Sequence, residues 1–457
     1  MMLHAPVRWI ARRCLRWFYR ERRFVGLERI PAHGPVLLIG NHPNDIPDVL
    51  CGYLTTPRRV LYVATVSGAT SKISQATYRG LGVIPVVRVR DARRLRKLGL
   101  DAAALNAAAF SRVVALLRAG EIVGVFPEGG VHDGPSLGLL RSGVAKMALS
   151  CSIDGTSKAL KIIAFGIQYD AARTPRSDVT IVVAEPLLLD DWMSKHEKMQ
   201  GNVALMLSDR MRTALLAATR NSSSWDAASQ RDRLIAVIGA LESGGDDSPL
   251  VSAARVQATC ATASDAADWP DNALRPLVDE IATAVARAGG IVTSSRDSAR
   301  VCAASGVQQV ESDWPSPVWL LLMTPLGLLG LLVHGPILVA IWKLAKRSTK
   351  DRSEWVARAF VPGLYLMLLW YVALGSMIAV GLHASAHSAW FAFPAVMLLP
   401  RLGDFAVTWR DALNAERLRR RVMRWSQADR AAVCITASAL RAAWHSHQTS
   451  SVVKASV

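Results

Sequence analysis

One histidine and two aspartates follow a short apolar run near the start of the chain. The run, residues 35–39, predicts a buried strand, and His42, Asp45 and Asp48 come soon after it. A neutral imidazole can remove a proton from a hydroxyl group when a carboxylate fixes its tautomer and stabilises the cation that forms. A strand that ends in Asn-His-Pro can equally begin an ordinary turn. The segment therefore leaves a general base and a plain turn open as alternatives.

Pro47 separates the two aspartates. A proline is tolerated only in the first turn of a helix, so the helix that follows is expected to begin at about Ile46. This start places Asp45 at the N-cap, where backbone N–H groups are expected to occupy its carboxylate. Asp48 is then the freer carboxylate and the expected partner of His42.

An arginine ends the apolar segment at residues 82–88, Gly-Val-Ile-Pro-Val-Val-Arg. The guanidinium group of Arg88 can hold a phosphate through two parallel hydrogen bonds, which makes it a candidate phosphate ligand. In a chain this rich in arginine, a solvated strand end is the alternative.

Glycines follow another apolar strand, in the sequence Phe-Pro-Glu-Gly-Gly that ends at Gly130. Gly129 and Gly130 would let the backbone approach a ligand closely or adopt positive φ. Glu128 could then bind the hydroxyl group of an acceptor or order the loop, and a Gly-rich turn with a solvated glutamate is the alternative.

Short apolar strands alternate with helices from about Gly26 to Leu189, a pattern typical of α/β proteins. Strands are predicted at 35–39, 59–64, 83–89, 121–126, 160–168 and 178–184. Helices are predicted at 46–55, 70–80, 101–119 and 140–150. Polar helices over 186–245 are expected to close this domain.

The composition favours a basic protein that contacts membranes. The chain has 457 residues, of which 51% are hydrophobic, and a formal net charge of +18. Such a charge suits nucleic acid, an anionic membrane surface or phosphorylated substrates. The arginines flank apolar segments and no nucleic-acid motif is present, so membrane lipids are the expected partner and nucleic acid is not. The six scattered cysteines, without a C-x-x-C pair, predict reduced thiols rather than disulfides or a zinc site.

The first segment, residues 8–25, combines aromatic and aliphatic side chains with seven arginines. It is too short in apolar residues to span a bilayer. The pattern predicts a basic amphipathic helix at the membrane interface, and a helix packed against its own domain is the alternative.

Two long apolar segments follow a sharp change of composition at Pro317. The first, 318–344, is interrupted at His334-Gly-Pro336, and the second, 360–382, has no charge over a length that can span a bilayer. A third stretch, 388–400, is shorter and favours a buried core helix.

Basic clusters at 343–352 and 401–424 are expected on the cytoplasmic side. If the first domain is cytoplasmic too, 318–344 must form a re-entrant hairpin that breaks at His334-Gly-Pro336. A second hairpin would then run over 360–400.

The chain is therefore expected to have five parts. They are a basic amphipathic helix at 1–25, an α/β domain at 26–245, a helical connector at 246–316, membrane helices or hairpins at 317–405, and a basic cytoplasmic tail at 406–457.

Four blocks, in this order and spacing, resemble the glycerol-phosphate acyltransferase superfamily over roughly residues 15–225. They are a histidine-spacer-aspartate block at 42–48, Gly-x-x-x-x-x-Arg at 82–88, Phe-Pro-Glu-Gly at 126–129, and the apolar strand at 161–169. Gly34-Pro35 and the whole run 126–137 are most similar to the subgroup that acylates glycerol 3-phosphate or dihydroxyacetone phosphate.

The resemblance implies an α/β acyltransferase domain with a mixed sheet flanked by helices, followed by a helical connector and a C-terminal hydrophobic, membrane-bound helical region. It implies transfer of a fatty acyl group from acyl-CoA or an acyl carrier protein to the sn-1 hydroxyl of glycerol 3-phosphate, with the catalytic domain on the cytoplasmic face. A lysophosphatidate or other lysolipid acceptor is one alternative, and a catalytically inactive lipid-binding scaffold is another. No metal or prosthetic group is implied.

The resemblance also assigns a role to each matching position. His42 would be the general base and Asp48 would orient it. Arg88 would bind the acceptor phosphate, and Glu128 with Gly129 and Gly130 would shape the acceptor pocket.

The chain departs from the superfamily pattern in three places. The aspartate lies six positions after the histidine instead of the commoner five, as it does in the related subgroup. Val131 stands where relatives commonly have serine, and Ala164 where they have proline. The hydroxyl missing at Val131 is expected to weaken or alter recognition of the acceptor.

Overall fold

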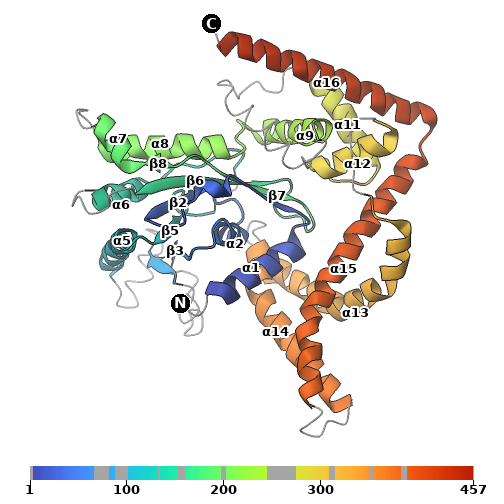
Figure 1. The fold of residues 1–457 in the computed structure, drawn as a ribbon, viewed down its shortest axis with the longest axis horizontal. Helices are drawn as coiled ribbons and strands as arrows, with labels where there is room; N and C mark the ends of the chain where they lie inside the picture. The colour runs from blue at the N-terminus through green and yellow to red at the C-terminus, as the bar shows by residue number, and fades with distance from the viewer. Residues whose placement is uncertain are drawn as a thin grey trace.

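The computed structural model shows a mixed sheet covered by helices and followed by several long helices (Figure 1). The described residues are 4–65, 82–87, 101–131, 134–152, 160–196, 202–243, 274–307, 314–348, 355–381 and 389–455. The strands are β1 Arg22–Val25, β2 Val36–Gly40, β3 Val60–Thr65, β4 Ile84–Val86, β5 Ile122–Val125, β6 Lys161–Tyr169, β7 Val179–Val183 and β8 Leu187–Leu188. The helices of the sheet domain are α1 His4–Phe18, α2 Ile46–Leu54, α5 Ala102–Arg118, α6 Gly143–Ser152, α7 Leu189–His196 and α8 Val203–Ala218. The remaining helices are α9 Trp225–Leu241, α11 Arg275–Arg287, α12 Ser295–Ser305, α13 Pro317–Ser348, α14 Trp355–Gly381, α15 Ala389–Met423 and α16 Gln427–Ala455.

The strands form one sheet in the order β1-β7-β6-β2-β5-β3-β4, with β8 also paired to β6. Pairing is parallel along β6, β2, β5, β3 and β4, and β7 runs antiparallel to β6. The predicted mixed sheet flanked by helices is confirmed. All six predicted strands are present, β1 and β8 are additional, and the helix predicted at 70–80 lies outside the described residues.

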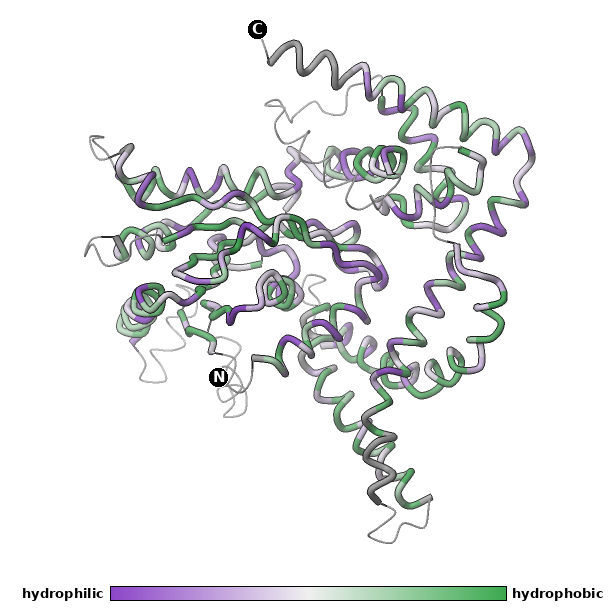
Figure 2. The backbone as a smooth tube through the Cα atoms, in the orientation of Figure 1, coloured by the Kyte–Doolittle hydropathy of each residue, from purple (hydrophilic) through white to green (hydrophobic). Residues whose placement is uncertain are grey.

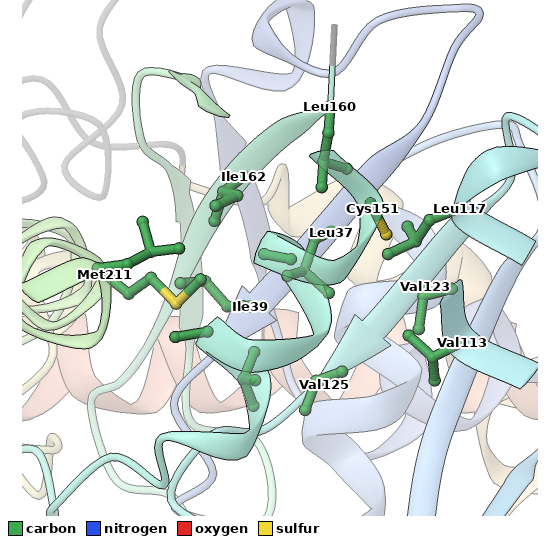
Figure 3. Close-up of a cluster of buried hydrophobic side chains, with 14 of the residues drawn as sticks. Leu37, Ile39, Val113, Leu117, Val123, Val125, Cys151, Leu160, Ile162 and Met211 are labelled. Carbon is green, nitrogen blue, oxygen red and sulfur yellow. The ribbon is translucent and has the colours of Figure 1, made fainter. Parts of the chain in front are cut away.

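The alternating side chains of β2 build a core on each face of the sheet, because successive residues of a strand point to opposite sides. Leu37 and Ile39 pack with side chains from α5, α6 and α8, as Figure 3 shows. Val36 and Leu38 pack on the other face with side chains from α1 and α2. The parallel strands between these two layers are buried and hold the carboxyl end of β2 in place.

The apolar side of helix α1 is buried inside the protein. Ala11 and Leu15 are fully buried, and Leu15 packs in the core under the sheet. Trp17 donates its Nε1–H to Asp404 of α15 at 2.8 Å. This packing follows the alternative given for the segment, although Trp9 keeps 52% of its surface exposed. The segment also ends earlier than a single helix over 8–25 would, because Arg22–Val25 pairs with β7 as β1.

A further hydrophobic core lies outside the sheet domain. Its buried side chains come from α9, α11, α12, α15 and α16, and they include Leu234, Ile281, Val301, Val422 and Trp444. Helix α9 lies within 26–245, predicted as the sheet domain, and α16 lies within 406–457, predicted as a tail. Both helices contribute buried side chains to this shared core.

Helix α13 continues through the position where a break was predicted. It runs as one bent helix from Pro317 to Ser348 with Pro325 and Pro336 inside it (Figure 1). Pro336 cannot donate a backbone hydrogen bond, but Trp370 of α14 donates its Nε1–H to the carbonyl of Val333 at 2.9 Å. A neighbouring helix thus satisfies a carbonyl in this turn. The break predicted at His334-Gly-Pro336, which the re-entrant hairpin required, is therefore wrong.

Among the residues that the structure describes, two helices are long and apolar enough to cross a membrane, over Pro317–Ser348 and Pro362–Val380. Figure 2 shows the hydrophobic colouring that runs along both α13 and α14. Their exposed surfaces carry large apolar side chains, including Leu321, Leu332 and Val372. Residues 389–400 of the shorter predicted stretch belong to α15, where Leu399 is buried and Leu398 is exposed.

Candidate active site

The carboxyl end of β2 delivers His42 to one edge of the sheet. Gly40 ends the strand, and a Cβ atom there would lie only 2.4 Å from the ring of Phe165. Asn41 then pairs with the backbone of Ile167 in β6, accepting from its N–H at 2.7 Å and donating to its carbonyl at 3.1 Å. The turn that carries His42 is therefore fixed to the neighbouring strand before the side chain begins.

His42 and Asp48 form the predicted pair. Nδ1 of His42 lies 2.9 Å from Oδ2 of Asp48, and the histidine side chain is 12% exposed whereas the aspartate is fully buried. When the carboxylate accepts from Nδ1–H, the neutral ring carries its lone pair on Nε2. No other group in the described parts of the chain hydrogen-bonds the ring. Nε2 is thus the nitrogen that can take a proton from a substrate.

Asp48 is held by three donors, and two of them were not predicted. Besides His42, the backbone N–H of Asn44 donates to Oδ2 at 2.7 Å, and the hydroxyl of Tyr169 donates to Oδ1 at 2.6 Å. Burial, together with the nearby charge of Asp48, raises the pKa of Tyr169 well above its usual value, so that this phenol stays a donor.

A further layer supports the donors. The buried Asn44 donates its amide to the hydroxyl of Tyr19 at 2.7 Å and to the carbonyl of Ala172 at 2.8 Å. The ring of Tyr19 also lies 5.2 Å from that of Tyr169. Tyr19, Tyr169 and Ala172 lie far from Asp48 in the sequence, and only the fold brings them near it. Asn44 lies four positions before Asp48, so its place in the sequence could have suggested the contact.

Asp45 does occupy the N-cap of α2, which begins at Ile46 with Pro47 in its first turn as predicted. Its side chain makes no hydrogen bond to the N–H groups of that turn, and its backbone has a φ of 57°. The expectation that cap bonds occupy this carboxylate is therefore wrong. Asp48 is the partner of His42 because of its position. It is not the freer carboxylate that was expected, since three donors hydrogen-bond to it.

Glu128 bridges two backbone segments. Its Oε1 accepts from the backbone N–H of His42 at 2.9 Å, and its Oε2 accepts from the N–H of Gly138 at 2.8 Å. Of the two roles considered for Glu128, this geometry fits ordering of the loop. The carboxylate fixes the histidine turn to the segment that follows the Phe-Pro-Glu-Gly block.

The Pro-Glu-Gly turn requires glycine at Gly129, which has a φ of 75°. Its N–H donates to the carbonyl of Phe126 at 3.0 Å. A Cβ atom at this position would lie 3.3 Å from Cγ of Arg141, so the exposed Arg141 side chain covers the turn. Gly130 and the exposed Val131 continue the loop from there. Arg141 thus adds a cation beside this loop that was not among the predicted site residues.

An aromatic stack supports the imidazole. The ring of Phe126 lies parallel to that of His42 with centroids 4.1 Å apart, and Tyr62 stacks beneath Phe126 at 5.6 Å. The ring of Phe165 meets Phe126 edge-on at 6.1 Å. These contacts restrict rotation of His42 and cover one face of it. Ala164, the other departure from the pattern, is buried inside β6 and pairs in register with Ile39.

Arg88 lies outside the described residues, so the structure leaves its position open. The strand before it, β4, is parallel to β3 and therefore ends at the same sheet edge as β2. Asn106 of α5 clamps the residue next to Arg88, because its amide accepts from the N–H of Val87 at 2.8 Å and donates to the carbonyl at 3.0 Å. This clamp fixes the point at which the chain leaves β4.

Residues 21–168 match a family model described as Acyltransferase. Two proteins of Saccharomyces cerevisiae are similar to part of the chain. Glycerol-3-phosphate O-acyltransferase 2 is 28% identical over 122 residues, which is 26% of this chain and 16% of that protein. Glycerol-3-phosphate O-acyltransferase 1 is 35% identical over 78 residues, which is 17% of this chain and 10% of that protein. These matches cover less than a fifth of the length of either relative.

Among solved structures, the 1-acyl-sn-glycerophosphate acyltransferase PlsC from Thermotoga maritima aligns at 13% identity with a TM-score of 0.32. The alignment covers 47% of this chain and 77% of that one.

Proposed function

We propose that this chain, whose residues 21–168 form a domain of the phospholipid and glycerol acyltransferase superfamily, transfers a fatty acyl group from a thioester to the sn-1 hydroxyl of glycerol 3-phosphate. The family match and the glycerol-3-phosphate O-acyltransferase relatives support an acyltransferase enzyme. The observation that carries the proposed chemistry is the buried Asp48, which holds Nδ1 of His42 at 2.9 Å and leaves Nε2 free to act.

In the proposed reaction, Nε2 of His42 removes the proton of the acceptor hydroxyl as the oxygen attacks the thioester carbonyl carbon. The new ester bond forms, the carbon–sulfur bond breaks, and the thiolate takes the proton from the imidazolium. The carboxylate of Asp48 stabilises the imidazolium between these two steps. Arg88 would hold the acceptor phosphate, and Glu128 with the turn at Gly129 and Gly130 would hold the loop beside it.

The proposed location is a membrane, with α13 and α14 inserted and the catalytic domain on the cytoplasmic face. Both helices meet the length that a bilayer requires, and the exposed Leu321 and Val372 would otherwise face water. Helix α14 also reaches the catalytic domain, since Phe360 packs with the core under the sheet and lies 5.5 Å from Phe18.

A lysophosphatidate acceptor is the second candidate. Helix α14 contacts α2, the helix that carries Asp48, so an acceptor dissolved in the bilayer would reach the site along a short path. A panel containing glycerol 3-phosphate, dihydroxyacetone phosphate and lysophosphatidate, each with acyl-CoA and acyl carrier protein donors, would identify the substrate pair.

The test of the mechanism is His42→Ala in the full chain. General-base catalysis is typically worth about 10²–10⁴-fold, so we expect a loss of acyl transfer in this range. His33→Ala is the matched control, because His33 is exposed and lies outside the site. Full transfer to every acceptor by His42→Ala would reject the mechanism.

A further inference from the structure

A second site of charged side chains lies between the sheet domain and the long helices. It is a pocket of about 520 Å³ lined by residues of α1, β1, α12, α13 and α15, and none of the active-site residues lines it. Its wall contains six arginines: Arg16, Arg20, Arg22, Arg176, Arg296 and Arg300. We call it the arginine pocket.

The arginine pocket has more positive than negative charge. Four carboxylates pair with its arginines among the residues that the structure describes: Glu21, Asp178, Asp297 and Asp411. Six guanidinium groups against four carboxylates leave an excess of two positive charges. A phosphomonoester, which carries about −1.5 to −2 at neutral pH, would balance this excess.

Arg300 carries a buried positive charge that nearby carboxylates compensate poorly. It is 7% exposed, and its nearest carboxylate, Asp297, lies 3.9 Å away and already accepts from Arg20 at 2.9 Å. Nε of Arg300 is buried without a hydrogen-bond partner. Burial, and then repulsion from Arg20 and Arg296, lowers the pKa of Arg300 to about 10. A buried cation of this kind calls for an explanation, and an anionic ligand supplies one.

Arg16 and Arg22 also favour an anionic ligand in the arginine pocket. Within the described residues, neither Arg16 nor Arg22 has a carboxylate in ion-pair contact. Arg22 donates instead to the carbonyl of Tyr19 at 3.1 Å. Burial, followed by repulsion from Arg16 and Arg176, lowers the pKa of Arg22. The unpaired guanidinium groups are the type of donor that binds phosphate through two parallel hydrogen bonds.

The other wall of the arginine pocket is apolar and leads onto α13. Trp314 and Trp319 line it, and tryptophan is typical of the membrane interface. The first turns of α13 expose Val318, Leu321 and Leu322, which keep 65%, 75% and 65% of their surfaces. The pocket thus places a phosphate-binding surface next to an apolar one.

We propose that the arginine pocket binds the phosphate headgroup of an anionic phospholipid whose acyl chains lie along the exposed start of α13. The proposal rests on the membrane insertion of α13 proposed above and does not depend on the transfer reaction. It assigns a lipid site that is separate from the acceptor site at His42.

Native mass spectrometry of the full chain in detergent tests the proposal, with phosphatidic acid as the probe and phosphatidylcholine as the comparison. We expect phosphatidic acid to bind at least tenfold more tightly. Loss of two charged hydrogen-bond donors in Arg22→Gln with Arg300→Gln should weaken its binding by about tenfold or more. Arg112→Gln with Arg275→Gln, at two exposed arginines of α5 and α11, makes the same charge change elsewhere and should bind as the unmodified chain does.

Equal affinity for the two lipids, or unchanged binding by the double variant, would overturn the proposal. Displacement of the lipid by inorganic phosphate or free CoA at matching concentration would show that the site takes a soluble phosphate instead. Without lipid, the double variant should unfold at the same temperature as the unmodified chain or higher, because an unbalanced buried charge is removed. A clear decrease, repeated by Arg22→Gln alone, would mean that these arginines are structural. Acyl transfer by the same preparations tests the active site separately.

Discussion

The negative charge of Asp48 beside His42 can be tested directly by a substitution. In Asp48→Asn, the amide oxygen is expected at the Oδ2 position, where it accepts from Asn44 N–H and from Nδ1–H of His42, and the NH₂ group would face the hydroxyl of Tyr169, which can accept. The neutral amide then no longer stabilises the imidazolium that forms when Nε2 takes the proton. We predict a loss of about 10²–10⁴-fold in kcat, measured with saturating acceptor and donor.

The rival aspartate provides the control for this prediction. Asp45→Asn changes the charge three positions away without altering the 2.9 Å contact between His42 and Asp48. It should keep most of the activity. Equal losses in the two variants would mean that any negative charge in this turn matters, rather than the carboxylate in contact with His42.

At this scale, the sequence predicted the residues that lie close together in the chain. The pairing of His42 with Asp48 follows from a short spacing and from the start of α2 at Ile46. The contact of Tyr169 could not be predicted, because it depends on β6 lying beside β2 in the sheet. Glu128 was identified, but only the structure shows that both its oxygens accept from backbone N–H groups.

At the scale of elements, Asn106 of α5 holds Val87 at the end of β4, one position before Arg88 in the sequence. Asn106→Ala removes both hydrogen bonds to Val87, at 2.8 and 3.0 Å. If Arg88 binds the acceptor phosphate, we predict that KM for glycerol 3-phosphate rises about tenfold while KM for the acyl donor changes little. Steady-state kinetics against each substrate measures the difference. A matched rise in both constants, or a fall in kcat alone, would contradict this role for the clamp.

A second element-scale prediction concerns the bend of α13. Trp370→Phe keeps an aromatic ring but removes the donor to the carbonyl of Val333 beside Pro336. We expect the unfolding temperature in detergent to fall, by the equivalent of about 1 kcal/mol. Trp225→Phe, at a position that is 60% exposed, should leave it unchanged. No difference between the two variants would show that this hydrogen bond is not needed for α13 to continue.

Elements with a clear hydrophobic pattern could be predicted, and elements whose conformation depends on residues distant in the sequence could not. The apolar runs at β2, β5 and β6 and the helical period of α5 gave boundaries within a few residues. Strand β1 was missed because its arginines continue the pattern of the helix before it, and only pairing with β7 makes it a strand. Trp370, which donates to the carbonyl of Val333 inside α13, lies 37 positions away in the sequence.

At the scale of the whole molecule, the described residues form hydrophobic cores on the two faces of the sheet and a further core between helices. The cores of the sheet domain hold the active site. The helical core joins α9 and α12 to the last turns of α15 and to α16, although more than a hundred residues separate α12 from Leu418 and Val422 of α15. Residues 406–457 resemble a basic tail in sequence because their buried positions are spaced among many exposed arginines. Their role becomes visible only when the partner helices are in place.

Trp444 is the residue that tests this organisation most directly. It is 1% exposed in the helical core, beside Leu440 and Ala437 of the same helix. Trp444→Ala would leave a large cavity, and such truncations typically cost about 3–5 kcal/mol. We therefore predict a clear fall in the unfolding temperature and early cleavage of α16 by protease, whereas Trp225→Ala at an exposed position should do neither. If α16 were a solvated tail, Trp444→Ala would be silent in both measurements, and α16 would be cleaved equally early in the unmodified chain.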